Sequence, residues 1–119
     1  MKRDTIRIEG KAIHATGSEV WMTLPELVEL FGTTAGAVYA GIKAILKENV
    51  LNDYEACKCI RLNRGNSADA YNMEVVIALA FRLDTYSAAL LRNWIVRKAT
   101  APVRTTPPIV LQYKEGVLN

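Results

Sequence analysis

Val20–Leu46 reads VWMTLPELVELFGTTAGAVYAGIKAIL, and this stretch decides the fold of the chain. Its apolar residues recur at helical spacing in two short segments, which Gly32 separates. Thr23 and Glu26 match the capping box that begins a helix, and glycine is the preferred residue just after a helix end. The stretch therefore predicts two short amphipathic helices joined by a tight turn. This is the sequence form of a helix-turn-helix, whose second helix commonly lies in the major groove of DNA.

The second helix of this pair, expected over Thr34–Leu46, has few of the side chains that usually read bases. On the face opposite its apolar stripe, the candidate contacts are Thr34, Tyr39 and Lys43. The rest of that helix is rich in small residues that let another backbone approach closely, namely Ala35, Gly36, Ala40, Gly41 and Ala44. The approaching backbone is a nucleic acid, a partner helix or another part of the same fold, and the sequence leaves these three open.

The flanking residues predict two hairpins. Thr5–Glu9 alternates apolar and polar residues, and together with the apolar run Val20–Met22 it suggests an N-terminal hairpin that leads into the first helix. Ala56–Leu62 and a return strand through Ala70–Tyr71 enclose a dense turn signal, so they predict a second hairpin. A winged helix carries its wing at this position. The basic residues of this wing, suited to phosphate contacts, are Lys58, Arg61 and Arg64.

Two more helices are expected after the wing. Asn72 is a suitable N-cap for a mostly apolar helix over Met73–Leu83, and Asp84–Thr85 begins another that runs to about Ala99. Its basic residues Arg92, Arg97 and Lys98 are expected to face water. The predicted fold is therefore α+β: a winged helix-turn-helix-like domain over residues 1–99, followed over residues 100–119 by an extended tail containing prolines. Ile109–Tyr113 in this tail has strand character.

The charge is distributed unevenly along the chain. Residues 1–57 hold six basic and eight acidic side chains, a net −2, whereas residues 58–104 hold eight basic and three acidic ones, a net +5. If a nucleic acid is bound by charge, the later part is expected to supply most of the attraction. A solvated basic surface without a ligand explains the excess equally well.

Residue types typical of catalytic and metal sites are scarce. The histidine His14 stands far from Cys57 and Cys59, so a four-ligand zinc site is not expected. The two cysteines are one residue apart, which disfavours a disulfide between them. No phosphate-binding loop or catalytic motif is present, and no apolar run is long enough to span a membrane. We therefore expect a cytoplasmic protein that is not an enzyme and binds neither metal nor cofactor.

Several segments in the same order and spacing resemble the RhuM family of bacterial virulence-associated proteins, often found on mobile elements. These segments are Val20–Thr23, Glu26–Leu27, Glu29–Gly32, Ile42–Lys43, Tyr71–Met73 and Arg92–Trp94. The similarity covers roughly residues 5–98. It implies a DNA-binding-like helix-turn-helix region and a role in transcription regulation. Family members tend to carry Arg, Ser, Thr and His near the start and middle of the second helix, where this chain has mainly Ala and Gly. This departure from the family predicts little base-specific recognition.

Two functions follow as hypotheses. The first is binding of double-stranded DNA with low sequence specificity, with Lys43 and Lys47 flanking the groove, Thr34 and Tyr39 touching its floor or backbone, and the wing residues holding phosphates. The second is a protein-protein interaction or homodimer module without enzymatic activity. It would use the helix Thr34–Leu46 or the C-terminal strand.

Overall fold

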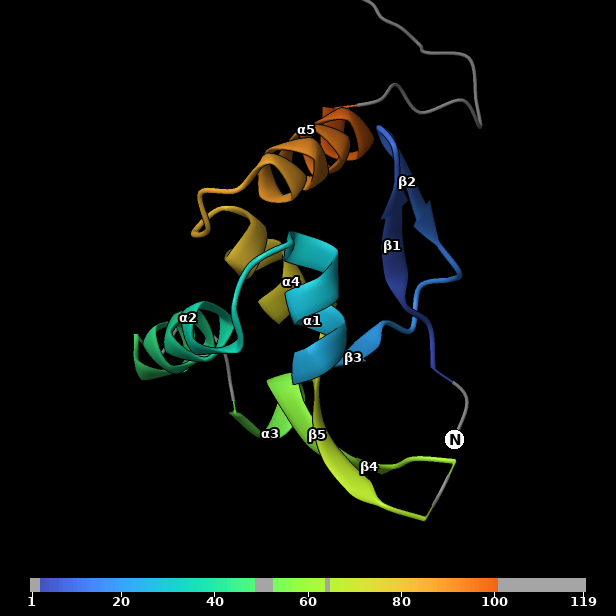
Figure 1. Ribbon diagram of the computed structural model, residues 1–119, viewed down its shortest axis with the longest axis vertical. Helices are drawn as coiled ribbons and strands as arrows, with labels where there is room; N and C mark the ends of the chain where they lie inside the picture. Colours follow the sequence, from blue (N-terminus) through green and yellow to red (C-terminus); the bar gives the residue numbers. More distant parts are fainter. Residues whose placement is uncertain (1–2, 49–52, 64, 101–119) are drawn as a thin grey trace, which may run out of the picture.

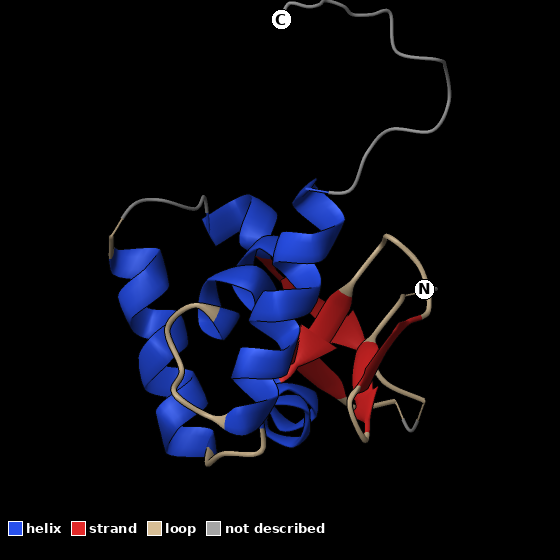
Figure 2. Cartoon of the chain, turned by 90° about the horizontal axis from the view of Figure 1, so that it is seen from above, coloured by secondary structure: helices blue, strands red, loops and turns tan. Residues whose placement is uncertain are grey.

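A computed structural model describes residues 3–48, 53–63 and 65–100 of the chain (Figure 1). The elements in chain order are β1 (Ile6–Glu9), β2 (Ala12–Ala15), β3 (Trp21–Thr23), α1 (Leu24–Phe31), α2 (Ala35–Lys47), α3 (Asp53–Ala56), β4 (Cys57–Arg61), β5 (Ser67–Asn72), α4 (Met73–Ala80) and α5 (Tyr86–Thr100). The strands form two small sheets, and helices cover one side (Figure 2). The predicted α+β class is confirmed.

The larger sheet has three strands in the order β3-β5-β4, and both pairings are antiparallel. The central strand β5 places Tyr71 opposite Met22 of β3 on one side and opposite Cys57 of β4 on the other. The chain thus leaves the edge strand β3, passes through α1, α2 and α3, and forms the other edge strand β4. It then returns along the central strand β5. The predicted hairpin after the two helices is present as β4 and β5.

The predicted N-terminal hairpin is wrong in its second strand. The partner of β1 is β2, with Ile6 opposite Ala15 and Glu9 opposite Ala12, whereas the Val20–Met22 run belongs to the three-stranded sheet. The reason is local, because Gly10 has a φ of 62° and allows a two-residue turn. The alternation of Thr5–Glu9 identified a strand but carried no information about its partner.

The base of this hairpin is fastened to the start of β3. Asp4 and Val20 form an isolated parallel bridge, in which the Asp4 N–H donates to Glu19 O at 2.9 Å and the Trp21 N–H donates to Asp4 O at 3.1 Å. The Asp4 carboxylate also accepts from the Glu19 N–H. Gly17 packs against this carboxylate so closely that a Cβ would collide with it.

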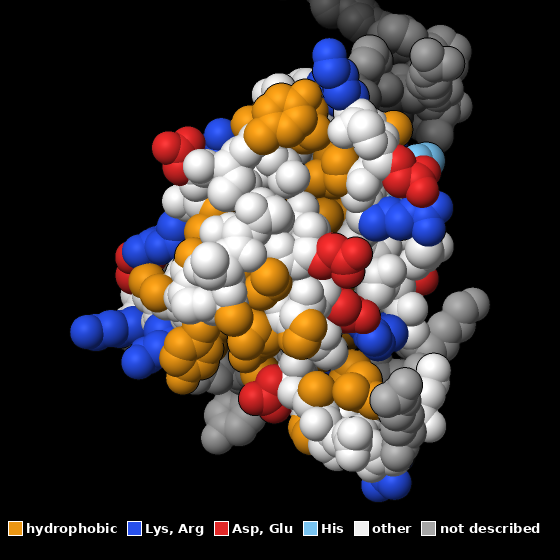
Figure 3. All heavy atoms as spheres, viewed as in Figure 1, with side chains coloured by type: hydrophobic (Ala, Val, Ile, Leu, Met, Phe, Trp, Pro, Cys, Tyr) orange, Lys and Arg blue, Asp and Glu red, His pale blue; other side chains and the backbone are white. Residues whose placement is uncertain are grey.

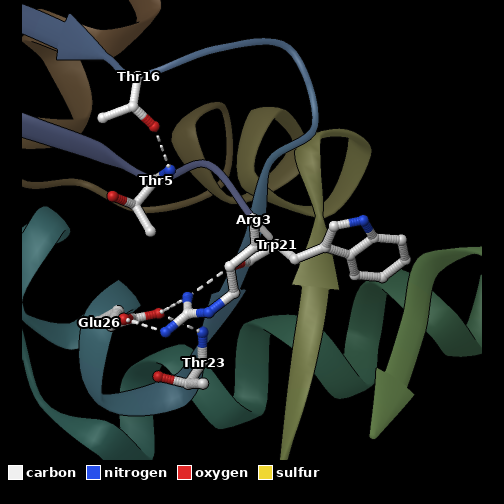
Figure 4. Close-up of polar contacts among 6 residues, drawn as sticks. All are labelled: Arg3, Thr5, Thr16, Trp21, Thr23 and Glu26. Carbon is white, nitrogen blue, oxygen red and sulfur yellow. Dashed lines mark hydrogen bonds and ion pairs between the residues drawn. The ribbon is translucent and has the colours of Figure 1, made fainter. Parts of the chain in front are cut away.

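The first turn of α1 is held by Arg3, as Figure 4 shows. Its guanidinium donates two hydrogen bonds to the Glu26 carboxylate, at 2.7 and 2.8 Å, and one to Trp21 O at 2.8 Å. Glu26 also accepts from the Thr23 N–H at 2.9 Å, as expected for the predicted capping box. Partial burial opposes ionisation of Glu26, but Arg3 and the Thr23 N–H outweigh it, so the pKa of Glu26 is lowered. The sequence indicated the capping box, not its ion pair with Arg3.

The turn between α1 and α2 follows the predicted signals. Gly32 closes α1 in the left-handed conformation, with φ 61°, and its N–H donates to Val28 O at 3.0 Å. Thr34 then caps α2, because its Oγ1 accepts from the Ala37 N–H at 3.1 Å. Local hydrogen bonds therefore fix both the end of α1 and the start of α2.

The core lies between the helices and the three-stranded sheet. The fully buried large side chains are Met22, Leu27, Phe31, Val38, Val75, Val76, Leu79 and Leu91. They come from β3 and from α1, α2, α4 and α5, so each helix contributes its apolar stripe to one cluster. The relative positions of α2 and the sheet are set by this shared core.

The last two helices differ from the prediction in one respect. Asn72 caps α4, as expected, but α4 ends at Ala80 rather than Leu83, and α5 runs from Tyr86 to Thr100. Arg92 explains the short connection, because its Nη1 donates to Ala80 O at 2.7 Å and to Leu83 O at 2.9 Å. The expectation that Arg92 faces water is therefore wrong, since it caps the carbonyl end of α4.

The predicted tail, including the strand Ile109–Tyr113, lies outside the described residues apart from Thr100, which ends α5. Arg64 of the predicted wing also lies outside them.

Candidate nucleic-acid interface

The outward face of α2 carries three of the predicted contact residues together. Tyr39, Lys43 and Lys47 are spaced by four residues, so they lie along one side of the helix, and all three are exposed. Val38, Ile42 and Ile45 occupy the opposite side and are buried. Core packing thus determines which side chains of α2 remain available to a ligand.

Tyr39 and Lys43 lie next to each other on this face. The Tyr39 side chain is 53% exposed, and the Lys43 ammonium lies 5.6 Å from the centroid of its ring. This distance is within the range of a cation–π contact. A phenol hydroxyl, an aromatic face and an ammonium are therefore presented side by side, a combination that suits phosphate and sugar groups.

Tyr39 also lies near the sheet. Burial raises the pKa of Tyr71 on β5, and the neighbouring Cys57, Asp69 and Tyr39 raise it further. The Tyr71 hydroxyl interacts with the Cys57 side chain. Tyr39 is thus close enough to Tyr71 for the two groups to interact electrostatically.

Thr34, the fourth predicted contact on this helix, is exposed, but its hydroxyl already accepts the capping hydrogen bond from Ala37 N–H. The hydroxyl proton remains available to an external acceptor. Thr34 therefore caps α2 and also presents a hydrogen-bond donor at the start of this helix.

The small residues of α2 differ in their surroundings, and Ala44 is half-buried. Gly41 faces α4, and a Cβ built on it would lie 2.9 Å from Leu79 Cδ2, so its role is close packing within the fold. Ala35, Gly36 and Ala40 are exposed, and nothing lies within 4 Å of a Cβ built on Gly36. Close packing within the fold therefore explains the small residue at Gly41. It does not explain the exposed small residues Ala35, Gly36 and Ala40.

The β4–β5 hairpin separates two of the predicted wing residues. Lys58 and Arg61 are three positions apart in β4, so their side chains leave opposite faces of the sheet. The Lys58 ammonium lies 4.0 Å from the centroid of the Trp21 ring. Arg61 is exposed, on the face that also carries Cys57 and Tyr71. Lys58 and Arg61 therefore do not form a single phosphate-binding surface.

Arg82 is a basic neighbour of α2 that the sequence did not indicate. It follows α4 and passes beside Gly41, and its guanidinium approaches the Glu48 carboxylate at 3.4 Å. Both side chains are about half exposed. This pairing joins segments 34 residues apart, so only the packing of α2 on α4 reveals it.

The basic residues of the later part are spread over the molecule. Lys58 lies on a tryptophan ring, Arg92 caps α4, and Arg97 and Lys98 are in the last turns of α5, at the end of the molecule far from β4 and β5 (Figure 1). Figure 3 shows basic and acidic side chains interspersed over the face in view. The net +5 of residues 58–104 therefore does not correspond to one basic surface.

Metal-binding clusters and membrane-spanning helices are both absent from the described residues. No three His, Cys, Asp or Glu side chains in that part of the chain are placed to hold a metal ion. None of the described helices combines the length and the apolar character needed to cross a membrane.

Comparison with known proteins gives no match to a family model, to a curated protein or to a solved structure. The resemblance to the RhuM family therefore stays a prediction from the sequence.

Proposed function

We propose that the chain is a winged helix-turn-helix module that binds double-stranded DNA with low sequence specificity and regulates genes of a mobile-element or virulence-associated locus. The observation that carries the proposal is the exposed line of Tyr39, Lys43 and Lys47 on the second helix of the pair. The regulatory role rests on the RhuM resemblance alone.

The topology supports this interpretation. A strand precedes the helix pair, a hairpin follows it, and the last strand of the hairpin lies between the other two. This arrangement agrees with a winged helix in which α2 is the recognition helix and the β4–β5 hairpin is the wing. In Figure 1 the hairpin extends from the helices on the same side of the molecule as α3.

The proposed contacts are mainly electrostatic. Lys43 and Lys47 contact phosphates from α2, Arg61 contacts them from the wing, and Tyr39 lies against the backbone or groove floor. Lys58 is left out, because its ammonium lies on Trp21 and on the other face of the sheet. The outer face of α2 offers no Asn, Gln or Arg for bidentate pairing with bases, so discrimination between sequences is expected to be below about tenfold.

Salt-dependent binding to a duplex tests the proposal. Three phosphate contacts predict that log K falls with log salt with a slope near −3, from roughly −0.9 per contact. Fluorescence anisotropy of labelled duplexes with two unrelated sequences, at several salt concentrations, measures both slope and specificity. Flat and very weak binding at low salt would contradict the proposal.

Two matched lysine substitutions test whether the exposed face of α2 is the DNA-binding surface. Lys43→Ala is expected to reduce the slope by about one unit. Lys11→Ala, in the exposed turn between β1 and β2, removes the same charge at another site and should leave the slope unchanged. Equal effects of the two substitutions would show that binding is only a response to net charge.

A homodimer contact through α2 is the second candidate function. It is favoured by exposed Ala35, Gly36 and Ala40 next to the half-exposed Tyr39, because small residues allow two helices to approach closely. Sedimentation equilibrium of the full chain and of Ala40→Glu separates the cases. A dimer that Ala40→Glu dissociates supports this function, and a monomer in both excludes it.

A further inference from the structure

The strand β1 has a free edge that faces a groove. Thr16 N–H donates to Thr5 O at 3.1 Å, so Thr5 and Arg7 direct their backbone groups toward β2, and Ile6 and Ile8 direct theirs away from it. Asp4 has the same orientation as Ile6 and Ile8, and its N–H and C=O bind Glu19 and Trp21. The segment that leads into β3 therefore pairs with this edge only at Asp4, just before β1 begins.

Beyond Asp4, no described residue pairs with the edge. The hydrogen bonds found among described residues include no partner for the Ile6 and Ile8 N–H and C=O groups on this side. Unpaired strand edges of this kind are templates for an additional strand.

The space next to this edge is large enough for a strand. A groove of about 500 Å3 runs between β1 and α1. Its lining combines apolar residues, Ile6, Ile8, Met22 and Leu30, with charged ones, Arg7, Glu9, Glu26 and Glu29. Figure 1 shows that β1 lies alongside α1. The groove therefore offers backbone hydrogen-bonding groups along one wall, and along the other Leu30 and Met22 together with the carboxylates of Glu26 and Glu29.

The chain itself supplies a segment that suits this groove. α5 contacts β2, and its last turn lies beside the turn that joins β1 and β2 (Figure 1). Residues 101–108 can span roughly 26 Å at about 3.3 Å per residue, about twice the length of β1. They lead to Ile109–Tyr113, which reads IVLQY and contains the β-branched and aromatic residues favoured in strands.

We propose that Ile109–Tyr113 of the same chain adds to the free edge of β1 as an antiparallel strand. Entry from the end nearest Gly10 makes its direction opposite to that of β1. Alternation then places Ile109, Leu111 and Tyr113 on one face, the face that Ile6 and Ile8 occupy in β1, while Gln112 is on the opposite face. The result is a three-stranded sheet with the order β2-β1-tail.

Amide hydrogen exchange of the full chain, followed by NMR, tests the proposal at single residues. The Ile6 and Ile8 amides are expected to be protected in the native chain, as the Arg7 amide is by β2. The variant Val110→Pro/Leu111→Pro removes strand donors from the tail, whichever of the two faces β1. Protection of Ile6 and Ile8 should then fall by at least about tenfold, while protection of Arg7 stays.

Val117→Pro is the matched control, because it introduces the same residue beyond the proposed strand and should change neither amide. Equal exchange at Ile6 and Ile8 in the native chain and the double variant overturns the proposal. Protection that rises with protein concentration also overturns it, since the tail of a second copy would then occupy the groove. None of these readouts depends on DNA, so they stand apart from the test of the proposed function.

Discussion

Gly41 of α2 faces Leu79 of α4 so closely that a Cβ on the glycine would lie 2.9 Å from Leu79 Cδ2. Leu79 is fully buried, so its methyl group has little room to move. The position of α2, and with it the direction in which Tyr39 and Lys43 point, therefore depends on the absence of a side chain at residue 41.

The two glycines of α2 are expected to respond oppositely to alanine. Gly36→Ala should stabilise the protein by up to about 1 kcal/mol, since alanine favours a helix and nothing lies near the new Cβ. Gly41→Ala gains the same propensity but overpacks the contact with Leu79, at a cost of about 1–3 kcal/mol. Urea denaturation measures both. Equal free energies of unfolding in the two variants would show that α2 and α4 are not packed as described.

The ion pair of Arg3 with Glu26 should make stability depend on pH. The pKa of Glu26 is lowered in the folded protein from its ordinary value of 4.5, so the stabilisation is present above about pH 4.5 and is lost as the pH falls through the lower, folded value. Arg3→Ala should cost about 1 kcal/mol at neutral pH and less in acid, because the pair is only partly buried.

Two variants separate this pair from general charge effects. Glu26→Gln can still accept from the Thr23 N–H but carries no charge, so it should lose the acid dependence. Arg7→Ala removes a more exposed pair with Glu9, 3.4 Å long, and should cost below about 0.5 kcal/mol. An Arg7 effect as large as that of Arg3 would argue against the special role of Glu26.

Arg92 should be more important for stability than its charge suggests. Arg92→Ala leaves the carbonyls of Ala80 and Leu83 without their charged donor and should cost about 1–2 kcal/mol. Arg97→Ala, on the same helix but exposed, should change the free energy of unfolding by less than about 0.5 kcal/mol. Thermal unfolding monitored by circular dichroism gives the comparison. Similar losses for both arginines would exclude the capping role.

Local signals made much of the fold predictable. Thr23, Gly32, Thr34 and Asn72 act on backbone groups within a few residues, so their positions in the sequence identified the helix ends. A dense turn signal between two short segments likewise identified the strand β4 and its partner β5. The pairing of the strands was harder to predict. The alternation in Thr5–Glu9 is compatible with any partner strand, and the turn at Gly10 determines that the partner is β2.

The candidate site was predictable to the extent that it lies on one helix. Helical spacing alone places Tyr39, Lys43 and Lys47 on one side of α2. Contacts between distant segments were not accessible, because no local pattern links Arg82 to Glu48 or Lys58 to Trp21. These contacts determine which of the basic residues are free to bind a phosphate.

The contact of Lys58 with Trp21 also provides a spectroscopic probe. The other tryptophan, Trp94, has Lys98 5.7 Å from its ring centroid, so each of the two indoles in the chain has an ammonium over it. The electric field of a cation shifts the emission wavelength of an indole. Because the emission of two indoles overlaps, Trp94→Phe would leave Trp21 as a reporter on the three-stranded sheet, and Trp21→Phe would leave Trp94 as a reporter on the last helix.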